Sequence, residues 1–169
     1  LAQFQAHLLI NPAAHLSAAQ LANLSAAVLK ACDHLDGVSD GVIENPLRCN
    51  FDPDVLACNA ESSANCLSPA QVSGVRRLYD GLHLTPDQAA VGGLSYGSED
   101  RWHAFLYGDK PGSAEFYAPV LGFFRHMVQD DNGWDLKQFE LNREGQTAQR
   151  KLAVVLDAAD PDIGRFVAR

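Results

Sequence analysis

Apolar residues recur with the period of a helix in the first part of the chain, directly after a helix-start signal. The stretch Ser17-Ala18-Ala19-Gln20 has the capping-box pattern, in which the Ser hydroxyl and the Gln side chain satisfy backbone amides at a helix N-terminus. The apolar positions that follow lie on one helical face; they are Leu21, Leu24, Val28 and Leu29. The pattern predicts an amphipathic helix that begins at this box.

The same start signal occurs again at Ser68-Pro69-Ala70-Gln71, with proline at the first helical position. Proline is favoured there because its missing N–H would have no partner inside the helix. The apolar face that follows consists of Val72, Val75, Leu78 and Tyr79. Gly81 is expected to end this second helix.

The remaining pattern is less regular. Residues 33–66 are rich in turn residues, and residues 85–112 form a middle segment that we expect to be irregular because it is rich in Gly and Pro. Residues 116–128 are aromatic and apolar and predict a helix or a packed helical turn. An amphipathic helix is predicted over 147–156, and Asp160-Pro161-Asp162 opens a short final helix. We expect an α+β fold class, mostly helical with short strands and long irregular loops.

The size and composition of the chain point to one domain and exclude some partners. A chain of 169 residues with 47% hydrophobic content is long enough to form one hydrophobic core. We expect a single domain, 1–169, with a loop region at 31–66 and a helical and aromatic region at 67–169. The formal net charge is −8, and the 13 Lys and Arg residues are scattered. Because nucleic acids and anionic membranes both require a positive surface, we expect neither as a partner. No apolar run reaches the roughly 20 residues of a membrane span.

An oxygen-rich loop at residues 33–44 indicates a calcium site. The carboxylates Asp33, Asp36 and Asp40 lie within eight residues and alternate with Gly37 and Gly41. Calcium prefers six to eight oxygen ligands, and glycine permits the unusual backbone angles of a short loop that wraps an ion. The spacing is not that of an EF-hand. The alternative is a solvated acidic turn.

The cysteines all lie in the loop region. Cys32 precedes the acidic loop and Cys49 follows it, whereas Cys58 and Cys66 bracket a second polar loop. Four cysteines allow three pairings, of which the sequential one would close each loop separately. Two disulfides would imply an oxidising compartment. A Cys₄ zinc site is disfavoured because no two cysteines have the short spacing of such sites.

The stretch Gly93-Leu94-Ser95-Tyr96-Gly97 matches the G-x-S-x-G pattern of a nucleophile elbow. That motif requires a strained turn between a strand and a helix, and the preceding residues do not form an apolar strand. We expect Ser95 to lie in a surface turn. His103 and His126 follow in the chain, so composition alone does not exclude a catalytic triad.

Aromatic residues concentrate in the middle third of the chain. Most are expected in the core, because large aromatic side chains dominate burial. A minority would line a ligand pocket. The candidates for substrate contact are Trp102, Phe123, Phe124 and Arg125.

Three stretches together resemble the tannase and feruloyl esterase family, which includes mono(2-hydroxyethyl) terephthalate hydrolase. They are Ala31-Cys32-Asp33-His34-Leu35-Asp36-Gly37-Val38-Ser39-Asp40-Gly41-Val42-Ile43-Glu44-Asn45-Pro46, then Cys49-Asn50-Phe51-Asp52-Pro53, and Cys66-Leu67-Ser68-Pro69-Ala70-Gln71-Val72 with Cys58 before it. Weaker likeness continues to Ile163. Members of this family are secreted α/β-hydrolases with a large lid inserted into the catalytic domain, and the lid carries a calcium site and disulfides at this spacing.

The resemblance implies calcium ligands in the acidic loop. These are the side chains of Asp33, Asp36 and Asp40 and the backbone carbonyls of Val38 and Val42. The ion would stabilise the fold and take no part in the chemistry.

The resemblance also implies the disulfides Cys32–Cys49 and Cys58–Cys66, and it shows what is missing. The family's nucleophile lies in a Cys-Ser-x-Gly-Gly stretch before the lid, and its Asp and His follow the lid. This chain contains no such stretch, so we expect no catalytic residue in it, and Ser95 inherits no role.

The expected function is that of a calcium-binding, disulfide-stabilised lid without the catalytic α/β core. Its partners would be the catalytic α/β-hydrolase domain of the parent protein and an aromatic ester substrate, in a secreted or periplasmic enzyme. Both ends look like cuts in a longer chain, and the chain alone would be inactive. Two alternatives are a free-standing calcium-stabilised binding module and a small serine hydrolase that uses Ser95.

Overall fold

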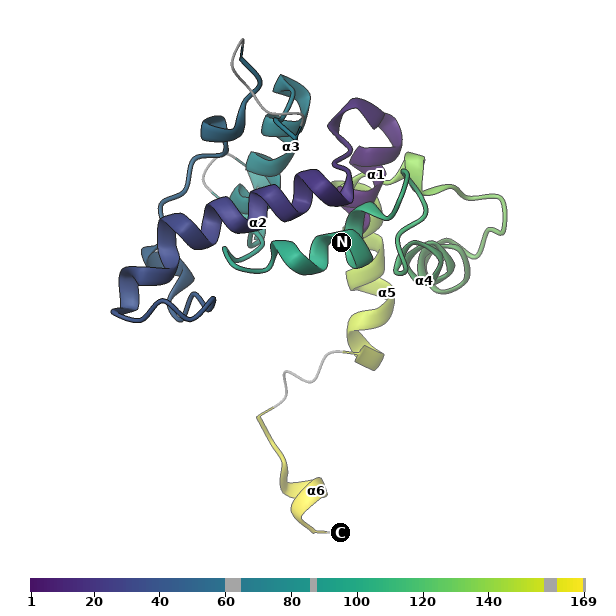
Figure 1. Ribbon diagram of the computed structural model, residues 1–169. Coiled ribbons are helices and arrows are strands. Elements are labelled where there is room, and N and C mark those ends of the chain that lie inside the picture. Colours follow the sequence, from purple (N-terminus) through teal and green to yellow (C-terminus); the bar gives the residue numbers. More distant parts are fainter. Residues whose placement is uncertain (60–64, 86–87, 157–160, 169) are drawn as a thin grey trace.

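The computed structural model describes residues 1–59, 65–85, 88–156 and 161–168 (Figure 1). Helices joined by long loops make up most of this part of the chain, and one two-stranded sheet accompanies them. The expected, mostly helical fold is therefore confirmed. None of the helices described is both long and apolar enough to cross a bilayer.

The two helices with a capping box begin where the sequence predicts. In α2 (Ala18–Cys32), Ser17 and Gln20 form both reciprocal bonds of the box. In α3 (Pro69–Asp80), the second box forms in the same way, and the helix ends at Gly81 with a φ of +80°. Local chemistry is sufficient here, because each cap satisfies amides within three residues of itself.

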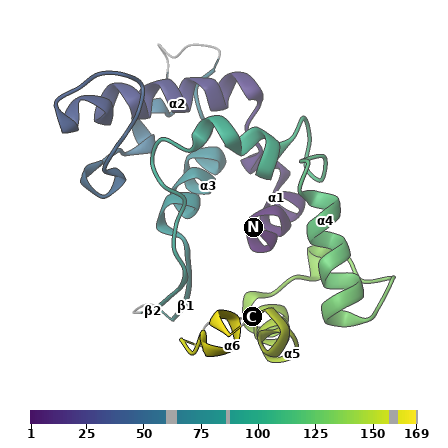
Figure 2. The same ribbon diagram turned by 90° about the horizontal axis from the view of Figure 1, so that it is seen from below.

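A hairpin follows α3 in a part of the chain where the sequence predicts no regular structure. Strand β1 (Leu82–Thr85) pairs with β2 (Gln88–Val91) in antiparallel orientation, and Figure 2 shows both projecting from the helices. After the hairpin, the Leu94 amide donates to the carbonyl of Leu78 at 2.8 Å. A Cβ atom at Gly93 would overlap the carbonyl of Tyr79, so only glycine permits this close return to α3.

The prediction of an irregular middle over 85–112 is therefore wrong for much of that segment. It contains β2, a 3-10 helix at Glu99–Arg101 and a π-helical turn at His103–Tyr107. Their signals are too short to detect by periodicity, because none exceeds five residues.

The helices of the second half agree with the predicted positions. The predicted segment 116–128 contains α4 (Tyr117–Gly122), which continues as a π-helical turn at Phe123–Gln129. The amphipathic helix is α5 (Gln146–Leu156), and the short final helix is α6 (Gly164–Val167). Asp160, expected to help open it, lies outside the described residues.

Short helical turns connect the larger elements. The 3-10 turns not yet named are Pro12–Ala14, Asp33–Asp36, Pro46–Arg48, Pro53–Leu56 and Leu136–Gln138, and a further π-helical turn is Leu141–Gly145.

The buried residues form two clusters, which we call the first core and the second core. The first core comprises Phe4, Leu8, Ala14, Leu16, Leu21, Leu24, Val28, Cys32, Cys49, Phe51, Leu67, Val72, Val75, Leu78, Trp102, Leu106 and Tyr107. The second core comprises Ala6, Phe124, Val128, Trp134, Leu136 and Phe139.

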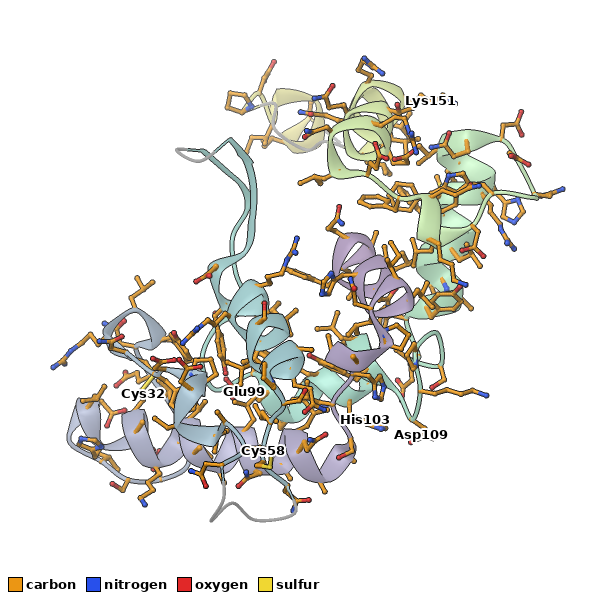
Figure 3. The ribbon with its side chains drawn as sticks, turned by 90° about the horizontal axis from the view of Figure 1, so that it is seen from above. Cys32, Cys58, Glu99, His103, Asp109 and Lys151 are labelled. Atoms are coloured by element: carbon orange, nitrogen blue, oxygen red, sulfur yellow. A yellow bond between two sulfur atoms is a disulfide. The ribbon has the colours of Figure 1, made fainter. Side chains whose placement is uncertain are left out.

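Helix α1 (Ala2–Ile10) joins the two cores. Phe4 and Leu8 enter the first core, whereas Ala6 enters the second. Figure 3 shows Cys32, Cys58 and Glu99 in the half of the molecule that holds the first core, and Lys151 of α5 in the other half. One short helix that is buried on two faces therefore connects the halves.

Candidate functional site

All four cysteines are paired in the structure. The disulfides are Cys32–Cys49 and Cys58–Cys66, and no cysteine is free. The pairs are those that the family resemblance implies. A Cys₄ zinc site is excluded, because no thiolate remains to bind a metal.

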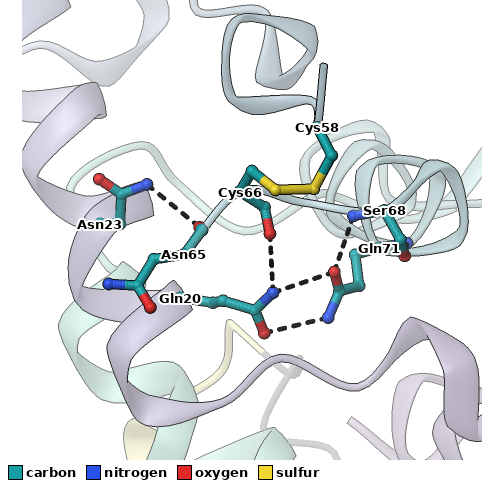
Figure 4. Close-up of a disulfide and its surroundings, with 7 residues drawn as sticks. All are labelled: Gln20, Asn23, Cys58, Asn65, Cys66, Ser68 and Gln71. Atoms are coloured by element: carbon teal, nitrogen blue, oxygen red, sulfur yellow. Dashed lines mark hydrogen bonds between the residues drawn. A yellow bond between two sulfur atoms is a disulfide. The ribbon is translucent and has the colours of Figure 1, made fainter. Parts of the chain in front are cut away.

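The second disulfide lies beside a link between the two capping boxes (Figure 4). The side-chain amides of Gln20 and Gln71 donate to each other's oxygens at 3.1 and 3.0 Å. Gln20 Nε2 also donates to the carbonyl of Cys66 at 2.9 Å. The N-termini of α2 and α3 and the second disulfide loop are therefore joined by one set of hydrogen bonds.

The acidic loop begins where α2 ends at Cys32, so the first disulfide anchors it. Two of its turns require glycine, since φ is +99° at Gly37 and +84° at Gly41. The Gly41 amide donates to the carboxylate of Asp33 at 3.1 Å. Asp36 accepts the amide of the residue two positions later at 2.9 Å, and Asp40 does the same at 3.1 Å. The loop is thus closed by carboxylate–amide bonds and is exposed to solvent.

The oxygens of this loop suit a hard cation in kind. Carboxylates and backbone carbonyls are the ligands that calcium prefers, and the carbonyls of Val38 and Val42 lie on the same exposed loop. Across the described part of the chain, however, no three His, Cys, Asp or Glu side chains gather into a metal site. Calcium binding by the aspartates therefore stays a prediction.

Ser95 lies in the turn that follows the hairpin and is exposed. Its backbone carbonyl accepts hydrogen bonds from the amide and the hydroxyl of Ser98, the latter at 2.6 Å. No histidine whose side chain the structure describes forms a hydrogen bond with Ser95. Ser95 therefore lies in a surface turn, as expected. A serine nucleophile needs a base beside its hydroxyl, and no described histidine side chain supplies one here.

The structure separates one candidate substrate contact from the other three. Trp102 is 2% exposed in the first core, where its Nε1 donates to the hydroxyl of Ser98 at 3.0 Å. Phe124 is buried in the second core, and the ring of half-buried Phe123 packs edge-on against it at 5.1 Å. Arg125 Nε donates to the carbonyl of Trp134 at 2.5 Å. Substrate contact by these four residues stays a prediction. Phe123 and Arg125 are more exposed to solvent than Trp102 and Phe124.

Sequence analysis did not anticipate a concavity of about 560 Å³ between α1, the end of α3 and residues 139–142, which we call the α1–α3 groove. Its volume lies in the range typical of small-molecule sites. It is lined by Gln3, Arg77, Asp80, Gly81, Phe139, Glu140, Leu141 and Asn142. No sequence signal marks it, because three segments far apart in the chain contribute to it.

A second unanticipated feature is the fully buried carboxyl group of Glu99. The hydroxyl of Tyr79 donates to it at 2.8 Å, and the amide of Gly97 donates to both of its oxygens at 3.0 Å. Burial raises the pKa of Glu99. Burial and the nearby Glu99 carboxylate also raise the pKa of Tyr79. A buried carboxylate without partners would be costly. The bonds from Tyr79 and Gly97 therefore stabilise Glu99 in its buried position.

Comparisons with known proteins agree on one group of enzymes. The family model for "Tannase and feruloyl esterase" matches residues 3–169. An uncharacterized esterase of Xanthomonas campestris pv. campestris is 33% identical over 94% of this chain and 30% of its own length. A probable feruloyl esterase B-2 of Aspergillus flavus is 35% identical over 70% of this chain and 22% of its own length.

Two solved structures share the fold of this chain. The crystal structure of feruloyl esterase B from Aspergillus oryzae matches 89% of this chain with a TM-score of 0.72 and 22% identity, over 31% of that protein's chain. An esterase from the same organism matches 90% of this chain with a TM-score of 0.73 and 21% identity. This chain thus spans less than a third of each of these relatives.

Proposed function

Because the chain belongs to the tannase and feruloyl esterase family, we propose that it forms the lid of a secreted or periplasmic carboxylic ester hydrolase that acts on esters of aromatic acids. The observation that carries the proposal is the extent of the match. The chain is covered almost completely, yet it spans 30% of the Xanthomonas esterase. The described residues form helices and one small hairpin rather than the sheet of an α/β-hydrolase.

In this proposal the chemistry takes place on the catalytic α/β-hydrolase domain of the parent protein. A Ser-His-Asp triad there would form and hydrolyse an acyl-enzyme. The lid would cover the active site, exclude water and shape substrate specificity. We assign the α1–α3 groove to the substrate, since Phe139 and Leu141 give it an apolar wall and Arg77 and Gln3 contribute polar groups. The disulfides support an oxidising compartment.

The test compares the full-length protein with the 169-residue chain, using methyl ferulate as substrate. The full-length protein is expected to hydrolyse the ester, and the chain alone is expected to be inactive. Ser95→Ala in the full-length protein should leave kcat unchanged. In contrast, Arg77→Gln should raise KM about tenfold, because a hydrogen bond to a charged group contributes about 1.5 kcal/mol.

Each alternative has its own outcome. Hydrolysis by the chain alone, abolished by Ser95→Ala and accompanied by phosphonate labelling of Ser95, would show a small serine hydrolase. A reading frame without hydrolase halves on either side of the chain would show a free-standing binding module.

We further propose that the acidic loop binds calcium through the side chains of Asp33, Asp36 and Asp40 and the carbonyls of Val38 and Val42. The oxygen chemistry, the two positive-φ glycines and the anchoring disulfide support this proposal. Bound calcium would offset the repulsion among the aspartates and stabilise the fold.

A chelator titration tests the calcium site. At free calcium a hundred times Kd, binding stabilises by about 2.7 kcal/mol, so chelation should lower Tm by about 5–10 °C. Asp40→Asn should abolish most of this difference. Asp100→Asn, at an exposed carboxylate outside the loop, is the matched control and should retain it. An unchanged Tm, with no calcium found by metal analysis, would show that the loop is a solvated acidic turn and not a calcium site.

A further inference from the structure

Four places in the chain have an aspartate or an asparagine directly before a glycine. At such pairs the glycine amide nitrogen can attack the side-chain carbonyl carbon of the preceding residue and close a five-membered succinimide ring. Glycine favours this attack because it has no Cβ atom to hinder the approach. The pairs are Asp36-Gly37, Asp40-Gly41, Asp80-Gly81 and Asn132-Gly133. The last pair is the reactive one near neutral pH, because a carboxamide is a better electrophile than an ionised carboxylate.

The Asn132-Gly133 pair forms a turn on the surface, directly before the buried Trp134 of the second core. Asn132 and Gly133 are both exposed to solvent. Within the described residues, the side-chain amide of Asn132 forms no hydrogen bond. Its carbonyl carbon is therefore accessible to a nucleophile from the backbone and, after ring closure, to water.

The nucleophile of this reaction is bound by a neighbouring carboxylate. The Gly133 amide donates to Asp131 Oδ1 at 2.8 Å. A hydrogen bond to an ionised acceptor is roughly twice as strong as a neutral one. A carboxylate is too weak a base to deprotonate a backbone amide, so this bond keeps the proton on the nitrogen. The negative charge of Asp131 also disfavours a second negative charge beside it.

The glycine amides of the three aspartate pairs are bound as well. Each donates to an oxygen earlier in the chain at 3.1 Å, from Gly81 to the carbonyl of Arg77 at the end of α3, for example. These pairs therefore combine a poor electrophile with a bound nucleophile. Asn132 differs, because it is a good electrophile and a single exposed side chain, that of Asp131, holds the nucleophile.

We propose that Asn132 is a site of spontaneous deamidation and that Asp131 sets its rate. When the bond to Asp131 opens, hydroxide removes the amide proton of Gly133, and the nitrogen forms a bond to Asn132 Cγ. The Cγ–Nδ2 bond then breaks, and the departing nitrogen takes a proton from water and leaves as ammonia. Water opens the succinimide at either carbonyl, which gives aspartate or the β-linked isoaspartate. The net reaction consumes one water and releases one ammonia, without an oxidant or a reductant.

The modification acts on the second core through the turn. Arg125 holds both ends of this turn, because its carbonyl accepts the Asp131 amide at 3.0 Å and its Nε donates to the Trp134 carbonyl at 2.5 Å. Isoaspartate lengthens the backbone by one methylene group inside the turn, and both products add a negative charge beside Asp131. Trp134, whose indole packs against Phe124 at 5.5 Å, is therefore the residue of the second core that the reaction displaces first.

Peptide mapping of the aged full-length protein tests the proposal. The folded protein is incubated at mildly alkaline pH for several weeks, conversion of Asn132 is followed by mass spectrometry, and isoaspartate is detected with protein isoaspartyl methyltransferase. The wild type is expected to deamidate slowly at Asn132. Asp131→Ala should accelerate the reaction about tenfold, equivalent to about 1.4 kcal/mol, because the charge-assisted bond that holds the Gly133 amide is lost.

Matched controls separate the hydrogen bond from charge and from exposure. Asp130→Asn removes the adjacent carboxylate, keeps the bond to Gly133 and should leave the rate nearly unchanged. Asn142 is an internal control, since it is exposed but is followed by arginine rather than glycine, and it should stay intact. Asn132→Gln should abolish the reaction at this position, because ring closure would need a six-membered ring.

Unfolding the wild type in urea provides a second test if Asp131→Ala does not fold. Urea opens the bond between Asp131 and Gly133 without a mutation, so deamidation at Asn132 should accelerate by at least the same factor. In the Trp102→Phe variant, the aged protein should lose its Trp134 fluorescence signal at lower urea than the fresh protein does.

Several results would overturn the proposal. If Asn132 stays intact, or reacts no faster than Asn142, it is not a modification site. Equal rates in the wild type and in Asp131→Ala would show that Asp131 does not protect the amide, and a slower rate in the variant would show that it acts as a base instead. An identical Trp134 transition in fresh and aged protein would overturn the effect on the second core. None of these readouts involves ester hydrolysis, so they leave the proposed function untouched.

Discussion

The first core and the second core are held together by different means. The first contains the disulfide Cys32–Cys49, and the disulfide Cys58–Cys66 lies beside it, directly before buried Leu67. It also receives two capped helices, so covalent bonds and local hydrogen bonds limit how this region can unfold. The second contains no cysteine and consists mainly of aromatic contacts, in which Phe124 packs against Trp134 at 5.5 Å and against Phe139 at 5.0 Å. Helix α4 begins without a side-chain cap and continues as the π-helical turn that contains Phe124.

This difference in cross-links and caps indicates which region of the chain is less constrained. A region secured by cross-links and caps keeps its shape when neighbouring parts shift, whereas packed rings can separate as a unit. In a lid, the first region would preserve the binding surfaces, and the second could adjust to substrate. The two tryptophans report on the two regions, because Trp102 lies in the first core and Trp134 in the second.

Reduction of both disulfides should have the largest effect. In the chain-entropy model each loop contributes roughly 3 kcal/mol, the shorter one slightly less, so their loss destabilises the first region by about 5–6 kcal/mol. Urea unfolding of the 169-residue chain is followed by fluorescence in the variants Trp134→Phe and Trp102→Phe. In reducing buffer the Trp102 signal should change at lower urea than the Trp134 signal. Coincident transitions in both buffers would show that the cores unfold as one unit.

Truncation of the central ring of the second core should rank next. Phe124→Ala is expected to cost about 3–5 kcal/mol, because the ring is buried against three others and its removal leaves a cavity. The loss should appear first in the Trp134 signal. Phe105→Ala is the matched control at a 38% exposed ring paired with Phe116 and should cost about 1 kcal/mol. Equal costs for both variants would mean that the second core is loosely packed.

Alkaline pH should weaken the first core selectively. Burial raises the pKa of Tyr79 and of Tyr107 above the ordinary value of about 10. As pH rises above 10, the unfolded chain releases phenolic protons that the folded chain retains, so stability falls with pH. At pH 11 each such tyrosine should lower the stability by on the order of 1 kcal/mol. Tyr79→Phe should remove its share of this pH slope in urea titrations at pH 9 and 11, and an unchanged slope would contradict the assignment.

Loss of one helix cap should have the smallest effect. Ser68→Ala removes the side-chain acceptor at the start of α3 and should cost about 1 kcal/mol. The control Ser73→Ala makes the same change at an exposed position within the helix, where alanine is favoured by a few tenths of a kcal/mol. Thermal unfolding of the two variants should therefore shift in opposite directions. Equal shifts would mean that the link between Gln20 and Gln71, rather than the serine, starts the helix.

The features that sequence analysis predicted correctly depend on residues close together in the chain. Both capping boxes depend on such local residues, and so do the segment 116–128, which contains α4, and helix α5. The sequence predicts the position of each to within a few residues. The disulfide pairs followed from the family resemblance, since spacing alone left three possibilities. The hairpin was missed because its strands have four residues each and its return to α3 depends on a contact between Gly93 and Tyr79.

The sequence by itself determined where the main helices begin, that the loop region is rich in cysteines and oxygens, and which family the chain resembles. Only the tertiary structure decided that the aromatic residues divide between two cores, that Glu99 is buried with the Tyr79 hydroxyl as a donor, and that three distant segments line the α1–α3 groove. The physical reason is range. Caps and acidic loops satisfy partners a few residues away, whereas a concavity joins side chains from segments whose meeting depends on the packing of the whole chain.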